Sequence, residues 1–446
     1  MNNAPNGGMS RRSLFKTAGL GALALGAIPI LDACSTYGLR TSSGAAGSDQ
    51  TIKIGYVSPR TGPYAVFAES DQFILAQARD FFSKGLQSGG TSYQVEILDR
   101  DTGSDAQQAA TIADELISQQ GVDLVLVTST PETIHPVAGK CESEGVPCIS
   151  TIEPWQAFFF GQNATPDRPF TYSYHFYNGI ETAAAVESDV WALTNTNMKV
   201  GVLWPNDSDG AAFRDPAQGY EAQIKDRGYT FIDPGAYENG TKDFSSIIAT
   251  FKDQGAEILA GVPSPPDFAT FWTQAAQQGF IPKVATISKA ILFSSAVAAL
   301  PNNSGNGLAI ASWWVPSYPS KSSFTGQTAQ ELTDAYEASP LSNGNQWNQG
   351  LGPNYALFEV ANAVLTATNP KDKKGVADQI GKTKVNTVQG LLDWTSGGAA
   401  NPVKNVATIP MVGTQWINTG GIFDLTVISN TLLPALPLGG SLVPLP

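Results

Sequence analysis

The stretch "ADELISQQGVDLVLVTSTPET", residues 113–133, decides the fold class because it joins the end of an amphipathic helix to a buried strand. Gly121 ends the helix, and the apolar run 122–127 predicts a strand that is covered on both faces. A helix leading into such a strand is the repeating unit of a parallel α/β sheet. The apolar residues of the helix recur at the spacing of one helix face: Ala109, Ile112, Ala113, Leu116 and Ile117.

The same alternation of strand and helix extends in both directions from this stretch. A break near residues 170–177 separates two such runs, so the sequence predicts an α/β fold of two doubly wound parallel-sheet lobes. Further strands are expected at 52–57, 148–151, 199–204, 257–262 and 284–287. Further helices are expected at 135–142, 220–224, 244–254, 268–278 and 357–365.

The first fifty residues carry export signals. The segment 10–16, "SRRSLFK", matches a twin-arginine signal, and the apolar stretch after it is shorter than the ~20 residues of a membrane-spanning helix. Leu31-Asp32-Ala33-Cys34 resembles a bacterial lipobox, which predicts a signal peptide over 1–33 and lipidation of Cys34. Residues 34–50 are then a polar tether, and the chain is lipid-anchored on the outer face of the cell membrane. An uncleaved membrane anchor is the alternative.

Composition limits the partners. The chain of 446 residues is long enough for two or more domains. Its formal net charge of −13 argues against nucleic acid as a partner.

Motifs of catalysis are absent from the sequence. It has only two histidines, His135 and His175, and no nucleophile elbow, zinc-protease or phosphate-binding loop motif. We therefore expect a protein that is not an enzyme and has no cofactor or metal; helix capping or packing is the default role of His135.

Polar loops follow the predicted strands. Each alone is most simply a turn or a helix cap. Ligands of parallel sheets bind at the carboxyl ends of strands, so six such loops together predict a small polar molecule held between the lobes. The loops are 58–64, 128–132, 150–155, 205–210, 263–267 and 288–289.

Several quoted segments carry a family likeness. "IKIGYVSPRTGPYAVF" (52–67), the opening stretch at 113–133, "GVPCIST" (145–151) and "NTVQGLLDW" (386–394) resemble landmarks of the solute-binding proteins of ABC transporters, specifically the branched-chain-amino-acid type. The likeness spans about residues 51–430. It implies two lobes joined by three crossovers, a monomer, and delivery of a small solute to a membrane permease. It also implies these boundaries: lobe I at 51–172 and 309–388, lobe II at 173–308 and 389–430, and a tail at 431–446.

The resemblance also implies which residues face the solute. Hydroxyls of the first lobe would hold its carboxylate and amine, an aromatic residue of the opening loop would cover it, and the second lobe would close over it. The implied residues are Tyr64, Ser129, Thr130, Ser150, Thr151, Trp155, Asp207, Asp209, Ser264 and Lys289.

One position departs from the family pattern. Members that bind Leu, Ile or Val commonly have an acidic residue in the last loop of lobe II, where this chain has Lys289. A lysine repels an amine and attracts an anion, although Asp207 or Asp209 offers an alternative partner for an amine. Arg60 either points to solvent or joins Lys289 in drawing an anionic solute. Extra tryptophans either stack on a ring or sugar or pack between the lobes: Trp155, Trp204, Trp313 and Trp314.

Two cysteines remain beside Cys34. Cys141 and Cys148 lie in the short segment "CESEGVPC" and are a candidate disulfide in an extracytoplasmic protein. Two buried thiols are the alternative, which twin-arginine export favours because that route carries proteins already folded in the cytoplasm. The spacing resembles no zinc site.

Three functions fit these observations. The first is the solute-binding component of an ABC importer, which binds an amino acid or a related carboxylate or amide. The second is a ligand sensor of the same fold that acts on a signalling partner. The third is an exported enzyme, which requires a nucleophile and a base within hydrogen-bond reach in the cleft.

Overall fold

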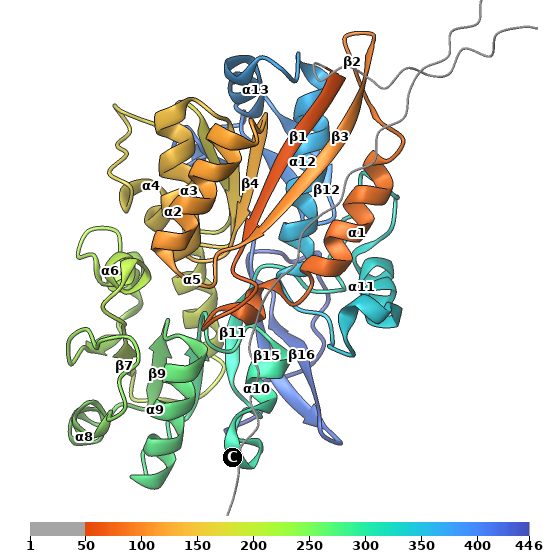
Figure 1. Ribbon diagram of the computed structural model, residues 1–446. Coiled ribbons are helices and arrows are strands. Elements are labelled where there is room, and N and C mark those ends of the chain that lie inside the picture. Colours follow the sequence, from red (N-terminus) through yellow and green to blue (C-terminus); the bar gives the residue numbers. More distant parts are fainter. Residues whose placement is uncertain (1–49, 446) are drawn as a thin grey trace, which may run out of the picture. The chain divides into compact units, whose positions relative to one another are not determined.

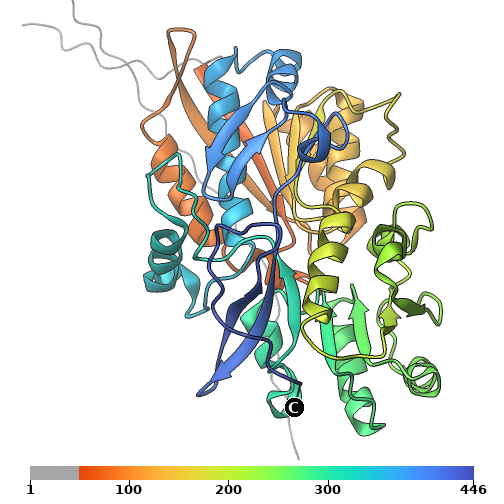
Figure 2. The same ribbon diagram turned by 180° about the vertical axis from the view of Figure 1, so that it is seen from behind.

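The computed structural model describes residues 50–445, which form two seven-stranded sheets and one small hairpin (Figure 1). The predicted signal peptide, the lipidation of Cys34 and nearly all of the predicted tether lie outside the described residues. The predicted fold class is confirmed: each large sheet is mostly parallel and carries helices on both faces (Figures 1 and 2). No helix of the described part of the chain is long and apolar enough to span a membrane.

The first sheet has the strand order β14-β6-β5-β4-β1-β3-β2. All its pairs are parallel except the hairpin of β2 with β3. The strands are β1 (Thr51–Ser58), β2 (Leu86–Ser88), β3 (Thr91–Asp101), β4 (Leu124–Thr128), β5 (Cys148–Thr151), β6 (Ser173–Phe176) and β14 (Val406–Ala407).

Every residue of β4 is buried because two apolar layers enclose it. Leu124 and Leu126 face the layer that includes α1 (Asp71–Phe82) and α12 (Leu351–Ala367). Val125 and Val127 point to the opposite layer. That second layer contains α2 (Ala106–Asp114), α3 (Pro131–Glu144) and α4 (Trp155–Phe160).

The second sheet has the order β16-β15-β11-β10-β9-β7-β8, with β15 and β16 antiparallel at one edge. Its strands alternate between two apolar layers in the same way. One layer holds α5 (Ile180–Trp191) and α7 (Tyr220–Ile224), and the other holds α8 (Ser245–Gln254) and α9 (Pro265–Gln277). The strands are β7 (Lys199–Leu203), β8 (Thr230–Ile232), β9 (Ile258–Gly261), β10 (Val284–Ile287), β11 (Ala309–Ser312), β15 (Val412–Thr419) and β16 (Ile422–Ser429).

The remaining elements are short. The helices are α6 (Ser208–Arg214), α10 (Ser294–Ala298), α11 (Ala329–Ala338) and α13 (Lys373–Ile380), and the hairpin pairs β12 (Lys384–Thr387) with β13 (Gly390–Asp393). The single turns are η2 (Ala65–Ala68), η3 (Glu115–Gln119), η4 (Lys225–Arg227), η5 (Pro301–Asn303), η6 (Pro340–Ser342) and η7 (Gly398–Ala400).

The chain passes between the two large sheets three times, but the pairing shifts the predicted boundaries. β6 lies beyond the predicted end of lobe I at residue 172, yet it pairs with β5 of the first sheet. β11 was assigned to lobe I and instead pairs with β10 and β15 of the second sheet. β14 was assigned to lobe II and instead pairs with β6. We use lobe I and lobe II below for the parts built on the first and second sheet.

The Pro- and Leu-rich tail, which the sequence left unassigned, packs on lobe II. The side chain of Gln415 exchanges hydrogen bonds with the backbone of Val443, at 2.7 and 2.8 Å. Gly439 N donates to Val427 O, and Leu436 is fully buried. The residues 430–445 therefore cover the β15–β16 edge of the second sheet.

The candidate disulfide is a correction. Cys141, near the end of α3, and Cys148, the first residue of β5, are both free and buried. A hydrogen bond with Cys141 and burial both raise the pKa of the Cys148 thiol. The structure thus contains the alternative, two neutral thiols in an apolar layer.

Candidate functional site

A cavity of about 50 Å³ lies where the carboxyl ends of strands from both sheets meet. Thr130 follows β4 and Glu153 follows β5 on the lobe I side, while Asp209 in α6 and Lys289 after β10 come from lobe II. This position agrees with the rule that ligands of open parallel sheets bind beyond the carboxyl ends of the strands. Apolar and aromatic walls complete the cavity: Phe67, Ile152, Tyr177, Phe213, Leu292 and Trp313.

The loops around the cavity carry unusual backbone. Ser129, Thr130, Ile152 and Lys289 all have positive φ, between 64° and 72°. For β-branched Thr130 and Ile152 this conformation is a true outlier. Hydrogen bonds from Ser129 N to Thr151 O and from Thr130 N to Ile152 O, at 3.1 and 3.3 Å, hold two of these turns together. Strain of this kind is maintained by the surrounding fold and clusters at functional sites.

Lys289 is the centre of a buried charge cluster. Its Nζ lies 2.6 Å from Asp209 Oδ2, 3.7 Å from Asp207 Oδ2 and 4.0 Å from Glu132 Oε1. The same nitrogen lies 4.8 Å from the ring centroid of Tyr64. Because Glu132 and Tyr64 belong to lobe I, this lysine contacts both lobes.

The pKa values of the cluster follow from burial and pairing. Burial would lower the pKa of Lys289, but the carboxylates of Asp209 and Glu132 outweigh it and raise the pKa. Burial raises the pKa of Asp209; Lys289 opposes this rise, and Asp207 and Glu132 add to it. We conclude that Lys289 is a charged lysine whose positive charge is already paired.

A second acidic group faces the cavity from lobe I. Glu153 is 2% exposed, and its Oε1 lies 3.2 Å from His135 Nε2 on α3. Burial raises the pKa of Glu153, while His135 opposes the rise. Burial would lower the pKa of His135, but Glu153 reverses this and raises it.

His175 holds the loop that carries Glu153 in place. Its Nε2 lies 2.9 Å from the backbone oxygen of Glu153, and its Nδ1 lies 2.8 Å from Ser150 Oγ. Burial lowers the pKa of His175 to about 3, so the ring is neutral and structural.

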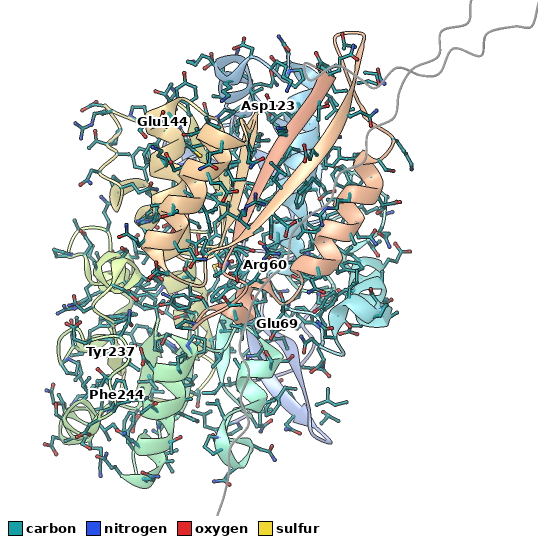
Figure 3. All side chains as sticks on the ribbon, viewed as in Figure 1. Arg60, Glu69, Asp123, Glu144, Tyr237 and Phe244 are labelled. Carbon is teal, nitrogen blue, oxygen red and sulfur yellow. The ribbon has the colours of Figure 1, made fainter. Side chains whose placement is uncertain are left out.

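Four polar atoms that line the cavity have no hydrogen-bond partner among residues 50–445. They are Thr130 Oγ1, Glu153 Oε2, Asn178 Nδ2 and Asp209 Oδ1, each on a side chain buried to 97% or more. A buried polar group without a partner costs about 1–3 kcal/mol, so their gathering at one cavity indicates a place for a polar ligand. Glu132 Oε2 and Tyr237 OH, near the same cluster, also lack partners (Figure 3 labels Tyr237).

The two lobes touch around the cavity. Ser295 Oγ of α10 donates to Glu69 Oε1 at 2.5 Å, and the rings of Phe67 and Phe293 pack edge to face at 4.9 Å. Trp313, in the segment that leaves β11, packs on Tyr177 at 5.1 Å. The two lobes therefore contact each other beside the cavity.

Five of the ten predicted site residues meet at this place. Thr130, Asp209 and Lys289 line the cavity, and Tyr64 and Asp207 contact Lys289. Asp207 also caps α6 by accepting from Gly210 N at 2.9 Å. Their roles in binding stay predictions.

The other five make contacts within the fold, and their roles in binding also stay predictions. Ser129 Oγ pairs with Thr128, Ser150 Oγ with His175, and Thr151 Oγ1 donates to Phe176 O at 2.8 Å. Ser264 caps α9 through Asp267 N, as a capping residue does. Trp155 Nε1 donates to Glu181 Oε1 at 2.9 Å, and the ring packs in an apolar layer. None of the five lines the cavity.

Arg60 takes neither of its predicted roles. It lies just past the carboxyl end of β1 (Figure 3), and its guanidinium pairs with Asp99 Oδ2 at 2.5 Å. Lys289 pairs with Asp209, so these two cations do not form an anion site together. That they attract an anionic solute therefore stays a prediction without support from this geometry.

Sequence reasoning missed Glu153 and Asn178. Glu153 lies inside one of the six polar loops, but its side chain was passed over in favour of the hydroxyls of Ser150 and Thr151. Asn178 follows β6, a strand that the sequence placed only as a break between the lobes.

Comparison with known proteins places the chain among binding proteins. A family described as periplasmic binding protein matches residues 51–416. A curated relative, Leu/Ile/Val-binding protein homolog 8 of Brucella abortus, is 24% identical over 243 residues. This match covers 52% of the chain and 56% of the relative, so the chain spans just over half the length of that relative.

Solved structures share the fold. A leucine-binding protein from Thermotoga maritima has a TM-score of 0.66 and 16% identity, and the match covers 85% of this chain and 99% of that one. A solute-binding protein of an ABC transporter from R. palustris, in complex with 4-hydroxybenzoate, has a TM-score of 0.65 and 16% identity, covering 85% and 96%.

Proposed function

Since the chain belongs to the periplasmic binding protein family, we propose that it is the extracytoplasmic solute-binding component of an ABC importer. It holds a small polar solute between its lobes and delivers it to a membrane permease. The observation that carries this proposal is the cavity at the strand ends, where unpartnered polar atoms of both lobes converge. Related proteins described as binding leucine or 4-hydroxybenzoate support a solute role but leave its identity open.

Closure of the lobes gives this function its mechanism. Thr130 and Glu153 belong to one lobe and Asp209 and Lys289 to the other, so a bound solute touches both. Such a solute stabilises the closed form by its extra contacts there. The permease then distinguishes loaded from empty protein by the state of the lobes. No covalent step is required.

The test is a thermal-shift screen of the protein without its signal peptide against amino acids, amides, amines, aromatic acids and polyols. We expect at least one class to raise the midpoint, since a ligand at ~1,000-fold excess over Kd adds about 4 kcal/mol of stability. Small-angle X-ray scattering of the same samples should show a smaller radius of gyration with the solute. A protein that no compound stabilises, and that carries no small molecule from the cell, would contradict the proposal.

We also propose that Cys34 is lipidated after export and tethers the protein to the outer face of the membrane. Cys34→Ala removes the only thiol that the lipobox-like segment offers. We expect this variant to move from the membrane fraction to the soluble extracytoplasmic fraction and to lose incorporation of labelled fatty acid. Cys141→Ala is the matched control and should leave membrane attachment unchanged. Unaltered attachment of Cys34→Ala would exclude the lipid anchor.

A further inference from the structure

Three of the four unpartnered atoms of the cavity can accept hydrogen bonds, while Asn178 Nδ2 donates. The three acceptors are Thr130 Oγ1, Glu153 Oε2 and Asp209 Oδ1, and they come from three different segments of the two lobes. Their residues are 2%, 2% and 3% exposed. A ligand that satisfies the carboxylate oxygens of Glu153 and Asp209 has to donate hydrogen bonds, and an anionic group such as a carboxylate has no proton to donate.

The charges around the cavity also favour a ligand that donates hydrogen bonds, in particular a cation. Four carboxylates lie around the cavity: those of Glu132, Glu153, Asp207 and Asp209. In the described part of the chain, their ion pairs there are with two cationic residues, Lys289 and His135. With all four carboxyl groups ionised, the cluster stays net negative even when His135 is protonated. Among the described residues that line the cavity, Lys289 is the only Lys or Arg, and its charge is paired with Asp209. A buried excess of negative charge is costly, and an added cation relieves it.

We propose that the solute is recognised by a primary ammonium group, held by Glu153, Asp209 and Thr130, and that it carries no carboxylate. The inference rests on the proposed binding function and names the class of its solute: a small cationic amine, with a neutral hydroxyl or amide oxygen for the free Nδ2 of Asn178. The three N–H groups of a primary ammonium match the three free acceptors, which a quaternary ammonium cannot satisfy.

Two further features fit an organic cation. The faces of Trp313 and Tyr177 line the cavity, and aromatic faces attract cations. The cavity has room for only about four water-sized groups, which suits a compact solute. A metal ion is a poorer fit, because no group of three or more His, Cys, Asp or Glu in the part of the chain described is arranged to hold one.

The experiment compares matched compounds on one skeleton. Ethanolamine, glycine and glycolate form the series, which matches the small size of the cavity. We expect ethanolamine to bind in calorimetry and raise the midpoint, while glycolate and glycine do neither. Calcium chloride is included as a bare cation. Binding of an acid, an amino acid or calcium in preference to the amines would overturn the inference, although the first two would leave the proposed function standing.

Variants test the residues that hold the ammonium. Glu153→Gln should weaken amine binding about 100-fold, because a buried charge-assisted hydrogen bond is lost. Glu144→Gln removes the same charge from the exposed end of α3 and should leave affinity unchanged. Equal affinity of Glu153→Gln and the wild type would overturn the assignment.

If no compound of the panel binds, the melting midpoint of the free protein still tests the inference. At pH 9, Glu153→Gln should raise the melting midpoint of the free protein by about 1–3 °C, because a buried charge is removed while the shape and the contact with His135 are kept. If Glu153 is instead a structural partner of His135, the variant should melt at a lower temperature than the wild type. A lower midpoint would overturn the inference.

Discussion

Lys289→Met is expected to lower the free energy of unfolding by about 3–5 kcal/mol and to shift the lobes of the free protein further toward an open form. Lys289 is only 5% exposed, and its ammonium lies 2.6 Å from Asp209 with Asp207 and Glu132 next nearest. Methionine fills a similar volume without the charge. The three carboxylates would then face one another in a buried place, which opening of the lobes would relieve.

Chemical denaturation and small-angle scattering measure the two effects. Lys283→Met is the matched control: its pair with Glu257 lies on the surface, where such pairs contribute about 0–1 kcal/mol. The double variant Lys289→Met with Asp209→Asn should recover part of the lost stability. Of the three carboxylates that lose their cationic partner, the double variant removes the charge of the most deeply buried one. A Lys289→Met protein within about 1 kcal/mol of the wild type, with an unchanged radius of gyration, would contradict the central role of this lysine.

The sequence predicted the elements whose residues are buried on both sides. Strands such as β4 are unbroken apolar runs, and the helices beside them have apolar residues along one face. The hydrophobic pattern alone therefore located these strands. β3 was missed because most of its residues, in "TSYQVEILDRD", are only partly covered and alternate with polar ones. β15 and β16 form an antiparallel edge that breaks the alternation of strand and helix on which the prediction rested.

The sequence predicted where the site lies, but not which side chains line it. The rule that ligands bind beyond strand ends found the loops of Thr130, Asp209 and Lys289 correctly. It could not separate Thr151, the last residue of β5, from Glu153 two residues later, because the turn at Ile152 has a positive φ that no sequence pattern announces. Only the folded chain shows which of these side chains reaches the cavity.

The charge of the site could not be predicted from one loop, because the partners of Lys289 are distant in the sequence. Read in its own loop, Lys289 indicated an anionic solute. Its partner Asp209 lies 80 residues earlier and Glu132 comes from the other lobe, so pairing reverses the interpretation. A single charged residue in a loop therefore says little about a ligand until the groups that neutralise it are known.

The same substitution at the ends of two neighbouring strands should have different consequences for binding and for stability. Thr130→Leu places bulk in a cavity of about 50 Å³ and removes a free acceptor. We expect it to weaken solute binding by at least about 100-fold, the loss that a charge-assisted hydrogen bond alone brings. The midpoint of the free protein should change by no more than about 2 °C, because Thr130 Oγ1 bonds to nothing in the described structure.

Thr151→Leu should act on folding instead. Thr151 is fully buried and donates to Phe176 O, so leucine removes that hydrogen bond and overpacks the contact between β5 and β6. The expected loss is about 2–5 kcal/mol of unfolding free energy. Solute affinity of the remaining folded protein should stay within a few-fold of the wild type, because Thr151 does not line the cavity. Denaturation and calorimetry on both variants separate the two roles; a stable Thr151→Leu protein that no longer binds would move the site from Thr130 to the strand end.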